Sequence, residues 1–497
     1  MIGLDLQFRK DLLPYLKTVI NETQSKEQTQ EVRLPEEMPD IGHVITSWGQ
    51  VLIRSKEWHP GGIGVSGGVM VWVMYAPENG ARMQCIETWL PFQFKREFEN
   101  PEKDGIVCAI PLLTAVDARS TSARKLIVRV GVDLQLQAKI KTTAELYQPE
   151  ELPDDVCLLK NIYPMVLPAE CGEKAFSLEE ELAFPASELQ LENFVYYNIW
   201  PQVTERKMLT DKLLFRGTVS LRVLYLDSEG ALCSWGTEVP FSQYTELERD
   251  YSDDVQSVIH MVTTNLELDK VQEGKCVLKA GLLAQYTIYD RTEIGIIEDA
   301  YSTKNKLIPE MSTLNLPSVL DAVQERVVVR PTEEVLHTTV MDMAFYPSAP
   351  EVFRDETGIC TEIQAAFCTL GGDDEGQLCG KISQWNDIKK LPSDPGVKVN
   401  AVAWPVCVEE KNGDWEALMQ LETQVISNRE LPVISGISLE PSPKSDLDRP
   451  TLILCRCGEK SLWELAKSVG ATVESIREIN ALTQEPDPQR LLLIPVP

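Results

Sequence analysis

Several absences narrow the classes of protein that this sequence can represent. The 497 residues include only four histidines, and the twelve cysteines contain no C-x-x-C pair. Structural zinc sites and disulfide frameworks need such groupings, so we expect neither, and we expect small buried thiols in a reducing cytoplasm. No apolar run approaches the roughly 20 residues of a membrane helix. Charged residues interrupt residues 1–20, where a signal peptide needs an apolar core. The sequence predicts a cytoplasmic chain without direct membrane insertion.

Basic side chains are also scarce. The chain has 47 Lys and Arg against 76 Asp and Glu, a formal net charge of −29. A field of this sign repels phosphate backbones and anionic lipid surfaces, so nucleic acid and bare membrane are not expected as partners. Protein partners, cations and neutral ligands remain. The composition is 43% hydrophobic and 25% charged, which is typical of a folded protein, and the length favours about three domains.

An internal repeat is the strongest organising feature. Residues 67–75 and 217–225 have matching alternation of apolar side chains, followed by a turn at Gly80 or Gly230. The offset is 150 residues at the closing tyrosines and at the turn glycines, and 149 at the Pro-Phe pairs that follow (Pro91-Phe92 and Pro240-Phe241). Alternation with period two predicts strands, and the glycine turns predict hairpins.

A weaker third copy begins near Thr361, where alternating apolar residues precede Gly371. The sequence thus predicts a mainly β fold with three tandem antiparallel, sandwich-like repeats. We place them at residues 1–165, 186–315 and 318–434. In addition, the apolar pattern of residues 4–20 predicts a short N-terminal helix, interrupted at Pro14.

The C-terminal region differs in composition. Residues 435–449 are rich in Ser, Pro and charge, which predicts a linker. Residues 450–497 carry 5 basic and 6 acidic side chains, so nearly all of the negative charge lies before them. Ser461 and Glu464 have the spacing of a capping box, and Thr472 can cap a second helix. With apolar extended segments at residues 451–457 and 491–494, the order predicted for this domain is β-α-α-β.

The run S-L-W-E-L-A-K beginning at Ser461, with A-T-V-E-S-I-R-E-I-N and L-L-L-I-P after it, resembles a LysM module. The family's usual Gly-Asp-Thr-Leu turn appears here with altered spacing, at residues 458–462. The resemblance implies a groove for a protein partner or for a glycan containing N-acetylglucosamine. Its predicted residues are Ser461, Leu462, Trp463 and Glu464 on one side and Asn480, Leu482, Thr483, Gln484 and Glu485 on the other. Trp463 also fits a core or rim aromatic.

Residues 27–42, the segment S-W-G-Q-V-L-I-R-S-K-E-W at 47–58 and the repeated strand resemble SPOCS repeats of sporulation coat proteins. Together with LysM they resemble the SpoVID/SipL class of spore morphogenetic proteins. The resemblance implies a non-enzymatic scaffold in the mother-cell cytoplasm, at the forespore surface, which engages a SpoIVA-like ATPase during coat assembly. The alternative is a protein that binds peptidoglycan or a chitin-like glycan through LysM.

Apparent catalytic motifs have simpler explanations. Residues 62–67 fit G-x-G-x-x-G and residues 64–68 fit G-x-S-x-G, but both motifs need a following helix, and a strand is predicted there. Acidic pairs at 154–155, 253–254 and 373–374 are expected in solvated turns. The four histidines (His43, His59, His260 and His337) lack the spacing of metal ligands. We therefore predict no catalytic, cofactor-binding or metal-binding residues.

Overall fold

The computed structural model describes residues 4–97, 104–331, 339–356, 358–373, 377–391, 396–411, 414–441 and 451–495. Strands account for 78% of the chain and helices for 4%, which confirms the mainly β prediction. Every pair of neighbouring strands for which a register is defined runs antiparallel. These pairs are β1–β20, β2–β7, β3–β4, β4–β5, β6–β7, β8–β13, β9–β10, β10–β11, β12–β13, β14–β20, β15–β17, β16–β17, β17–β18, β19–β20 and β21–β22.

The same pairing scheme occurs three times along the chain. In each case a long first strand pairs with the last strand, the last strand pairs with the one before it, and the strands between form a second sheet. We call these groups unit 1 (β2–β7), unit 2 (β8–β13) and unit 3 (β14–β20). In unit 3 a short strand, β16, also pairs with β17.

The bounds of the strands are as follows. Unit 1 and the strand before it comprise β1 (Leu4–Leu6), β2 (Phe8–Arg33), β3 (Ile41–His59), β4 (Gly62–Pro77), β5 (Gln84–Glu97), β6 (Ile106–Ser122) and β7 (Lys125–Pro149). Unit 2 comprises β8 (Val156–Ala183), the 3-10 turn η1 (Leu191–Asn193), β9 (Phe194–Leu209), β10 (Lys212–Leu226), β11 (Leu232–Glu246), β12 (Gln256–Leu268) and β13 (Lys275–Ser302). Unit 3 comprises β14 (Lys306–Val329), β15 (Thr339–Pro347), β16 (Glu351–Asp355), β17 (Gly358–Gly372), β18 (Leu378–Leu391), β19 (Val397–Lys411) and β20 (Asp414–Glu440).

The prediction of an N-terminal helix over residues 4–20 is wrong, because this segment forms β1 and the first half of β2. β1 pairs with β20, and β2 pairs with β7 along its whole length. Leu4, Leu6 and Phe8 alternate with period two, which suits a strand. Pro14 is tolerated because β2 lies at the edge of its sheet, where one side of the strand needs no hydrogen-bond donors.

The predicted boundaries fall inside long strands. The first repeat was predicted to end at residue 165, which lies within β8, and residues 315–318 lie within β14. Turns separate the units instead at residues 150–155 and 303–305. The predicted linker begins at residue 435, but β20 continues to Glu440, and residues 442–449 lie outside the described residues.

The repeated glycines have a steric explanation. A Cβ at Gly67 would lie 2.1 Å from the carbonyl oxygen of Leu52, and one at Gly217 would lie 1.9 Å from that of Gln202. Phe92 and Phe241 place their rings over these same glycines from the neighbouring strands. Close packing therefore accounts for the repeated Gly and Phe. Residues 62–68 are the first part of strand β4, which continues through the predicted strand at 69–75, so no helix follows them and they do not form a phosphate-binding or oxyanion turn.

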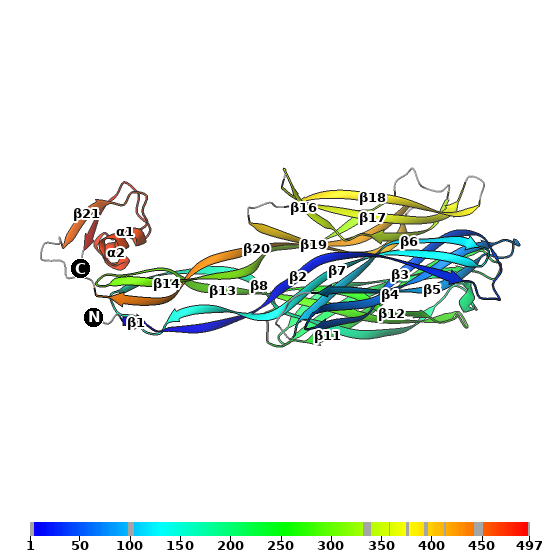
Figure 1. Cartoon of the computed structure of the whole chain (residues 1–497), viewed down its shortest axis with the longest axis horizontal. Coiled ribbons are helices and arrows are strands. Elements are labelled where there is room, and N and C mark those ends of the chain that lie inside the picture. The colour runs from blue at the N-terminus through cyan, green and yellow to red at the C-terminus, as the bar shows by residue number, and fades with distance from the viewer. Residues whose placement is uncertain are drawn as a thin grey trace.

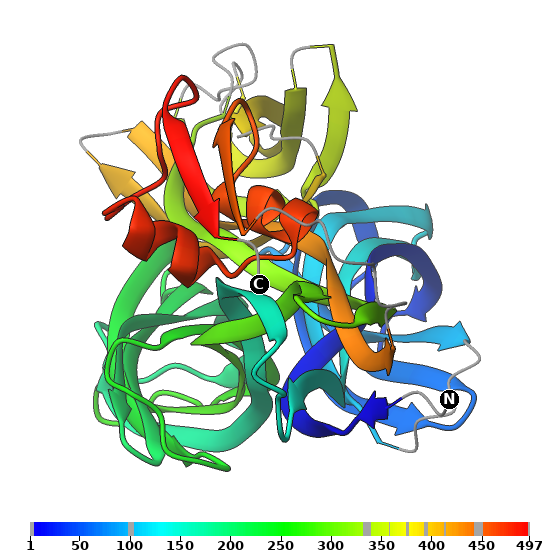
Figure 2. The same cartoon turned by 90° about the vertical axis from the view of Figure 1, so that its left-hand side faces the viewer.

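Three two-stranded ribbons extend beyond the body of the molecule (Figure 1). We call them the stalk; they are the outer parts of β2/β7, β8/β13 and β14/β20. All three ribbons contribute to one apolar cluster of the stalk, which contains Ala144, Met165, Leu167, Ile294, Ile296, Leu314, Leu316, Leu431 and Val433. Viewed along the stalk, the three units surround a common axis (Figure 2). Each ribbon therefore covers apolar faces of the other two.

Buried polar contacts join the units. Gln285 in unit 2 donates to the carbonyl oxygen of Ala109 in unit 1 and accepts from its N–H, both at 2.9 Å. The ammonium of Lys56 donates to the same glutamine at 2.6 Å. Units 2 and 3 meet where Nε2 of His260 lies 3.2 Å from a carboxylate oxygen of Glu422. These contacts fix the units against one another, since a buried polar group left without a partner is costly.

Candidate partner-binding site in the C-terminal module

The C-terminal module has the predicted order of elements: β21 (Leu452–Arg456), α1 (Leu462–Val469), α2 (Val473–Ile479) and β22 (Leu491–Pro495). Both bonds of the capping box are present, because Ser461 accepts from the N–H of Glu464 and the carboxylate of Glu464 accepts from that of Ser461. Thr472 accepts from the N–H of Ser475 and begins α2. In the part of the chain that the structure describes, no helix is long and apolar enough to cross a membrane.

The two predicted sides of the groove lie next to each other. The N–H of Leu462 donates to a carboxylate oxygen of Glu485 at 3.1 Å, which bridges the loop before α1 and the loop after α2. Thr483 and Gln484 are exposed beside this bridge, as is Ser461. We call these three exposed residues of the predicted set the groove rim.

Other predicted groove residues have structural roles. Leu462 is fully buried in the core of the module, and Leu482 packs against that core. Asn480 exchanges two hydrogen bonds with the backbone of Leu493, at 2.6 and 2.8 Å, and donates to the carbonyl of Ile476 at 2.8 Å. It therefore holds the end of α2 on β22 and has little capacity left for a ligand. Glu464 closes the capping box.

Trp463 faces the stalk. Its indole N–H donates to Oδ2 of Asp299 in β13 at 2.8 Å, and the ammonium of Lys467 lies 2.7 and 2.8 Å from the two oxygens of the same carboxylate. The ring of Tyr301 packs edge-on against Trp463 with centroids 4.8 Å apart. The hydroxyl of Tyr301 donates to the carbonyl of Ala471 at 2.7 Å. We call this set of interactions the docking contact; it holds the module beside the tip of the stalk (Figure 1).

The docking contact has defined electrostatics. Burial alone would raise the pKa of Asp299, but hydrogen bonds from Lys467 and Trp463 hold it below its ordinary value. Asp299 is therefore a carboxylate at neutral pH, and its charge is matched by Lys467. Burial raises the pKa of Tyr301, so its hydroxyl keeps the proton that it donates.

Asp155 accepts from Ser302 at 2.5 Å and from Asn305 at 3.0 Å, which orders the turn after β13.

Sequence reasoning missed Asp299 and Tyr301. Both lie in β13, and Asp299 is 164 residues away from Trp463. Nothing in the local pattern of residues 296–302 distinguishes them from other residues of a strand. Lys467 also went unnoticed, because a lysine on the exposed side of an amphipathic helix is ordinary. The pairing is visible only once the fold brings the module to β13.

The outer face of the module's sheet is apolar and exposed. In β21, Leu452 and Leu454 are 46% and 60% exposed; in β22, Leu491 and Leu493 are 54% and 36% exposed. Leu454 lies directly opposite Leu493, and residues two apart in a strand share a face, so the four side chains lie together. We call them the leucine face. Ile453, Leu492 and Ile494 point the other way, into the core of the module.

Candidate metal ligands do not cluster in the part of the chain that the structure describes. No group of three or more His, Cys, Asp and Glu side chains is placed to hold a metal ion among the described residues. His43 and His59 lie near opposite ends of β3, His260 lies in β12, and His337 is outside the described part of the chain. The acidic pairs at 154–155 and 253–254 lie in turns, as predicted, and Asp373 follows β17.

Part of the chain matches a protein-family model. Residues 190–273 match the family model described as "SipL, SPOCS domain". This match supports the prediction that the chain contains a SPOCS domain. The matched segment covers β9 to β12 of unit 2 and includes the second copy of the repeated strand. It indicates a sporulation-related protein. Comparisons with curated proteins and with solved structures give no match.

Proposed function

We propose that this SPOCS-domain protein is a non-enzymatic scaffold of endospore coat assembly, located in the mother-cell cytoplasm at the forespore surface. The three units present several large strand-built surfaces. The C-terminal module, which we infer to be a LysM domain, is its interaction module. The SPOCS match at residues 190–273 supports the link to sporulation. The tandem units support a role in holding several proteins together, because linked sites raise the effective concentration of each partner.

The observation that carries this proposal is the position of Trp463. In a glycan groove an aromatic ring serves as a stacking platform. Here the indole N–H of Trp463 donates a hydrogen bond to Asp299, and the ring packs against Tyr301. The module therefore uses this edge for a protein contact within the chain. Its leucine face remains exposed, and an apolar patch of this kind suits a protein partner better than a polar sugar. The partner that we propose is a SpoIVA-like ATPase of the coat basement layer.

A second candidate is glycan binding through the rim of the groove. Ser461, Thr483 and Gln484 are exposed and carry donors and acceptors that could meet hydroxyl and acetamido groups. Peptidoglycan or chitin oligomers would be the ligands. This function does not need the leucine face, so the two candidates depend on different residues.

The two candidates can be separated with the full chain and two pairs of substitutions. Leu454→Lys with Leu493→Lys makes the leucine face cationic without disturbing the core, because both side chains point outward. Thr483→Ala with Gln484→Ala removes polar groups of the groove rim. Binding is measured by biolayer interferometry against the purified coat-basement ATPase and by calorimetry against chitin oligomers. Circular dichroism verifies that both variants fold.

Under the scaffold proposal, the ATPase binds the native chain and the rim variant, and binding falls at least about tenfold in the leucine-face variant. Chitin oligomers do not bind any of the three chains. Saturable binding of chitin that is lost in the rim variant, together with no binding of the ATPase, would establish the glycan function instead.

A further inference from the structure

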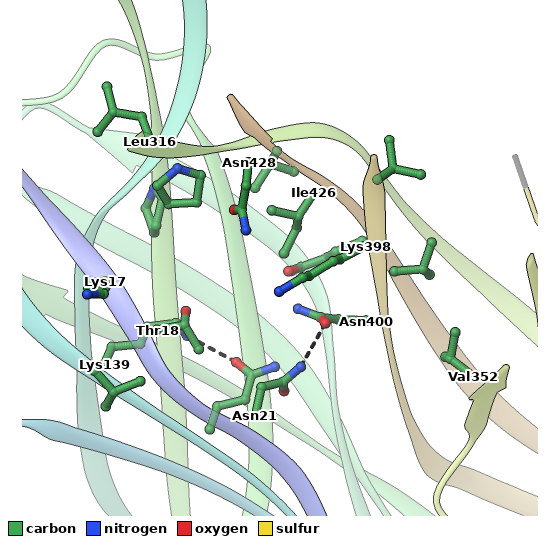
Figure 3. A pocket seen from close by; sticks show the side chains of 18 of the residues that line it. Lys17, Thr18, Asn21, Lys139, Leu316, Val352, Lys398, Asn400, Ile426 and Asn428 are labelled. Atoms are coloured by element: carbon green, nitrogen blue, oxygen red, sulfur yellow. Dashed lines mark hydrogen bonds between the residues drawn. The ribbon is translucent and has the colours of Figure 1, made fainter. Parts of the chain in front are cut away.

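A large cavity lies where the stalk ribbons separate into the body (Figure 3). Its volume is about 820 Å³, which is within the range of small-molecule sites. Unit 1 contributes β2 and β7, unit 2 contributes Pro168 of β8 and Tyr289 of β13, and unit 3 contributes β14, β16, β17, β19 and β20. The cavity therefore exists only when the three units are assembled.

The charge of the lining is opposite to that of the chain. Lys17, Lys139, Arg354 and Lys398 line the cavity, against a single carboxylate, Glu430. The chain as a whole carries −29. None of the four cations forms an ion pair with a carboxylate among the described residues. The four cationic side chains around the cavity are therefore not used for ion pairs within the described part of this acidic chain, and their charge is available to a ligand.

Lys139 is the most constrained of the four. The residue is 4% exposed, and its ammonium donates to the amide oxygen of Gln137 at 3.1 Å and to the hydroxyl of Thr287 at 3.2 Å. Both acceptors are neutral. Burial alone would lower the pKa of Lys139, but the neighbouring thiols of Cys171 and Cys108 raise it, so the ammonium stays charged. A thiolate at Cys171 offsets part of this charge, so the exposed side chains of Lys17 and Lys398 supply most of the positive potential of the cavity.

The remaining lining combines amides with apolar side chains. Lys398 and Asn428 reach into the same space from β19 and β20, opposite Asn21 on β2 (Figure 3). Nδ2 of Asn21 donates to Oδ1 of Asn400 at 2.7 Å, which closes one side between units 1 and 3. The half-buried Ile426 and Val399 belong to the apolar part of the wall. A matching ligand has an anionic head and an apolar body.

We propose that this cavity binds a small amphipathic anion. Its carboxylate or phosphate group lies between Lys17 and Lys398, with Lys139 behind, and its apolar part packs against Ile426 and Val399. Because residues of units 1 and 3 contact the ligand, binding stabilises the packed arrangement of these two units over a separated one. The inference concerns the centre of the molecule, and it stands independently of the C-terminal module and its partner.

The test uses 1-anilinonaphthalene-8-sulfonate as an anionic fluorescent probe and N-phenyl-1-naphthylamine as its uncharged counterpart. Both are titrated into the full chain, into a Lys17→Gln/Lys398→Gln variant and into a Lys95→Gln/Lys207→Gln control. The control pair lies on exposed parts of β5 and β9, away from the cavity. All three chains carry Leu454→Glu and Leu493→Glu, so that the leucine face repels the anionic probe.

We expect one saturable site for the anionic probe in the parent and control chains and at least about tenfold weaker binding in the cavity variant. The uncharged probe binds the parent and the cavity variant equally. Hexanoate or hexyl phosphate displaces the anionic probe, and the more effective competitor identifies the preferred head group. Inorganic phosphate at the same concentration does not displace the probe. Equal binding of the anionic probe by cavity variant and control would overturn the proposal, as would equal displacement by inorganic phosphate.

Discussion

Gln135 holds the backbone of Ala403 by two hydrogen bonds: its amide oxygen accepts from the N–H at 3.0 Å, and its amide nitrogen donates to the carbonyl at 2.9 Å. This contact joins unit 1 to unit 3. Gln285 makes the same two bonds to Ala109 and joins unit 2 to unit 1. Gln135 and Gln285 are 150 residues apart, the same offset as the repeated strands. The sequence repeat therefore builds not only similar units but also similar contacts between them.

The first prediction concerns this contact. Gln285→Leu leaves the backbone N–H and carbonyl of Ala109 without a partner in a buried interface. It also removes one of the acceptors of the Lys56 ammonium. We expect a loss of about 2–3 kcal/mol in the free energy of unfolding, because each unsatisfied buried group costs about 1–3 kcal/mol. Urea denaturation followed by tryptophan fluorescence measures it. Gln364→Leu, at an exposed position, is the matched control and should change stability by less than about 0.5 kcal/mol. Equal losses in both variants would contradict the role of the interface.

The second prediction concerns the docking contact. Asp299→Ala removes the acceptor for both Trp463 and Lys467, so the module should leave the stalk more often. Charge-assisted hydrogen bonds of this kind contribute about 1–2 kcal/mol, so we expect amide hydrogen exchange in α1 to rise about 5- to 30-fold. Mass spectrometry of peptides covering residues 462–471 measures it. Glu478→Ala, on the exposed side of α2, is the control and should leave the exchange unchanged. No change in the Asp299→Ala protein would show that the docking contact does not hold the module.

The third prediction concerns pH. The pKa of Asp299 is lowered in the docked state, so docking favours the charged carboxylate. The stabilisation from this group is therefore complete above the ordinary aspartate pKa of about 3.9 and is lost as the pH falls through the lowered value. We expect the exchange of residues 462–471, corrected for its intrinsic pH dependence, to be constant from pH 7 to 5 and to rise below about pH 4. The Asp299→Asn protein should lack this rise. A rise centred near pH 6 would point to a different group.

The fourth prediction concerns two buried cysteines. Sγ of Cys108 in unit 1 lies 3.7 Å from Sγ of Cys171 in unit 2. A hydrogen bond from Cys108 and the charge of Lys139 lower the pKa of Cys171 to about 6, against the cost of its burial. Its thiolate can attack glutathione disulfide and release one glutathione; Cys108 then displaces the second and forms a disulfide between the units. Mass spectrometry should find this cross-link after partial unfolding in mild urea with glutathione disulfide. It should be absent from a Cys108→Ser protein, and pairing of Cys171 with other cysteines instead would contradict the geometry.

Local patterns predicted local structure, and distant contacts decided the rest. The β4 and β10 hairpins followed from alternation and turn glycines, and α1 followed from its capping box. The prediction of a helix over residues 4–20 is wrong because Leu12, Leu13 and Leu16 have the spacing of a helical face. In the structure this segment instead pairs as a strand with β7 and β20, which lie more than 100 residues away in the sequence. For the same reason Asp299 could not be found from the sequence. The long strands also hid the unit boundaries, since only pairing shows that β8 belongs with β13.

The most direct test of the scaffold proposal is the location of a full-length fluorescent fusion in sporulating cells. The account predicts that fluorescence appears with sporulation and encircles the forespore from the mother-cell side. It predicts that a fusion carrying Leu454→Lys and Leu493→Lys, expressed at the same level, loses this localisation and stays diffuse in the mother cell. Fluorescence in vegetative cells at the cell wall, or outside the cell, with no ring around the forespore, would contradict the proposal.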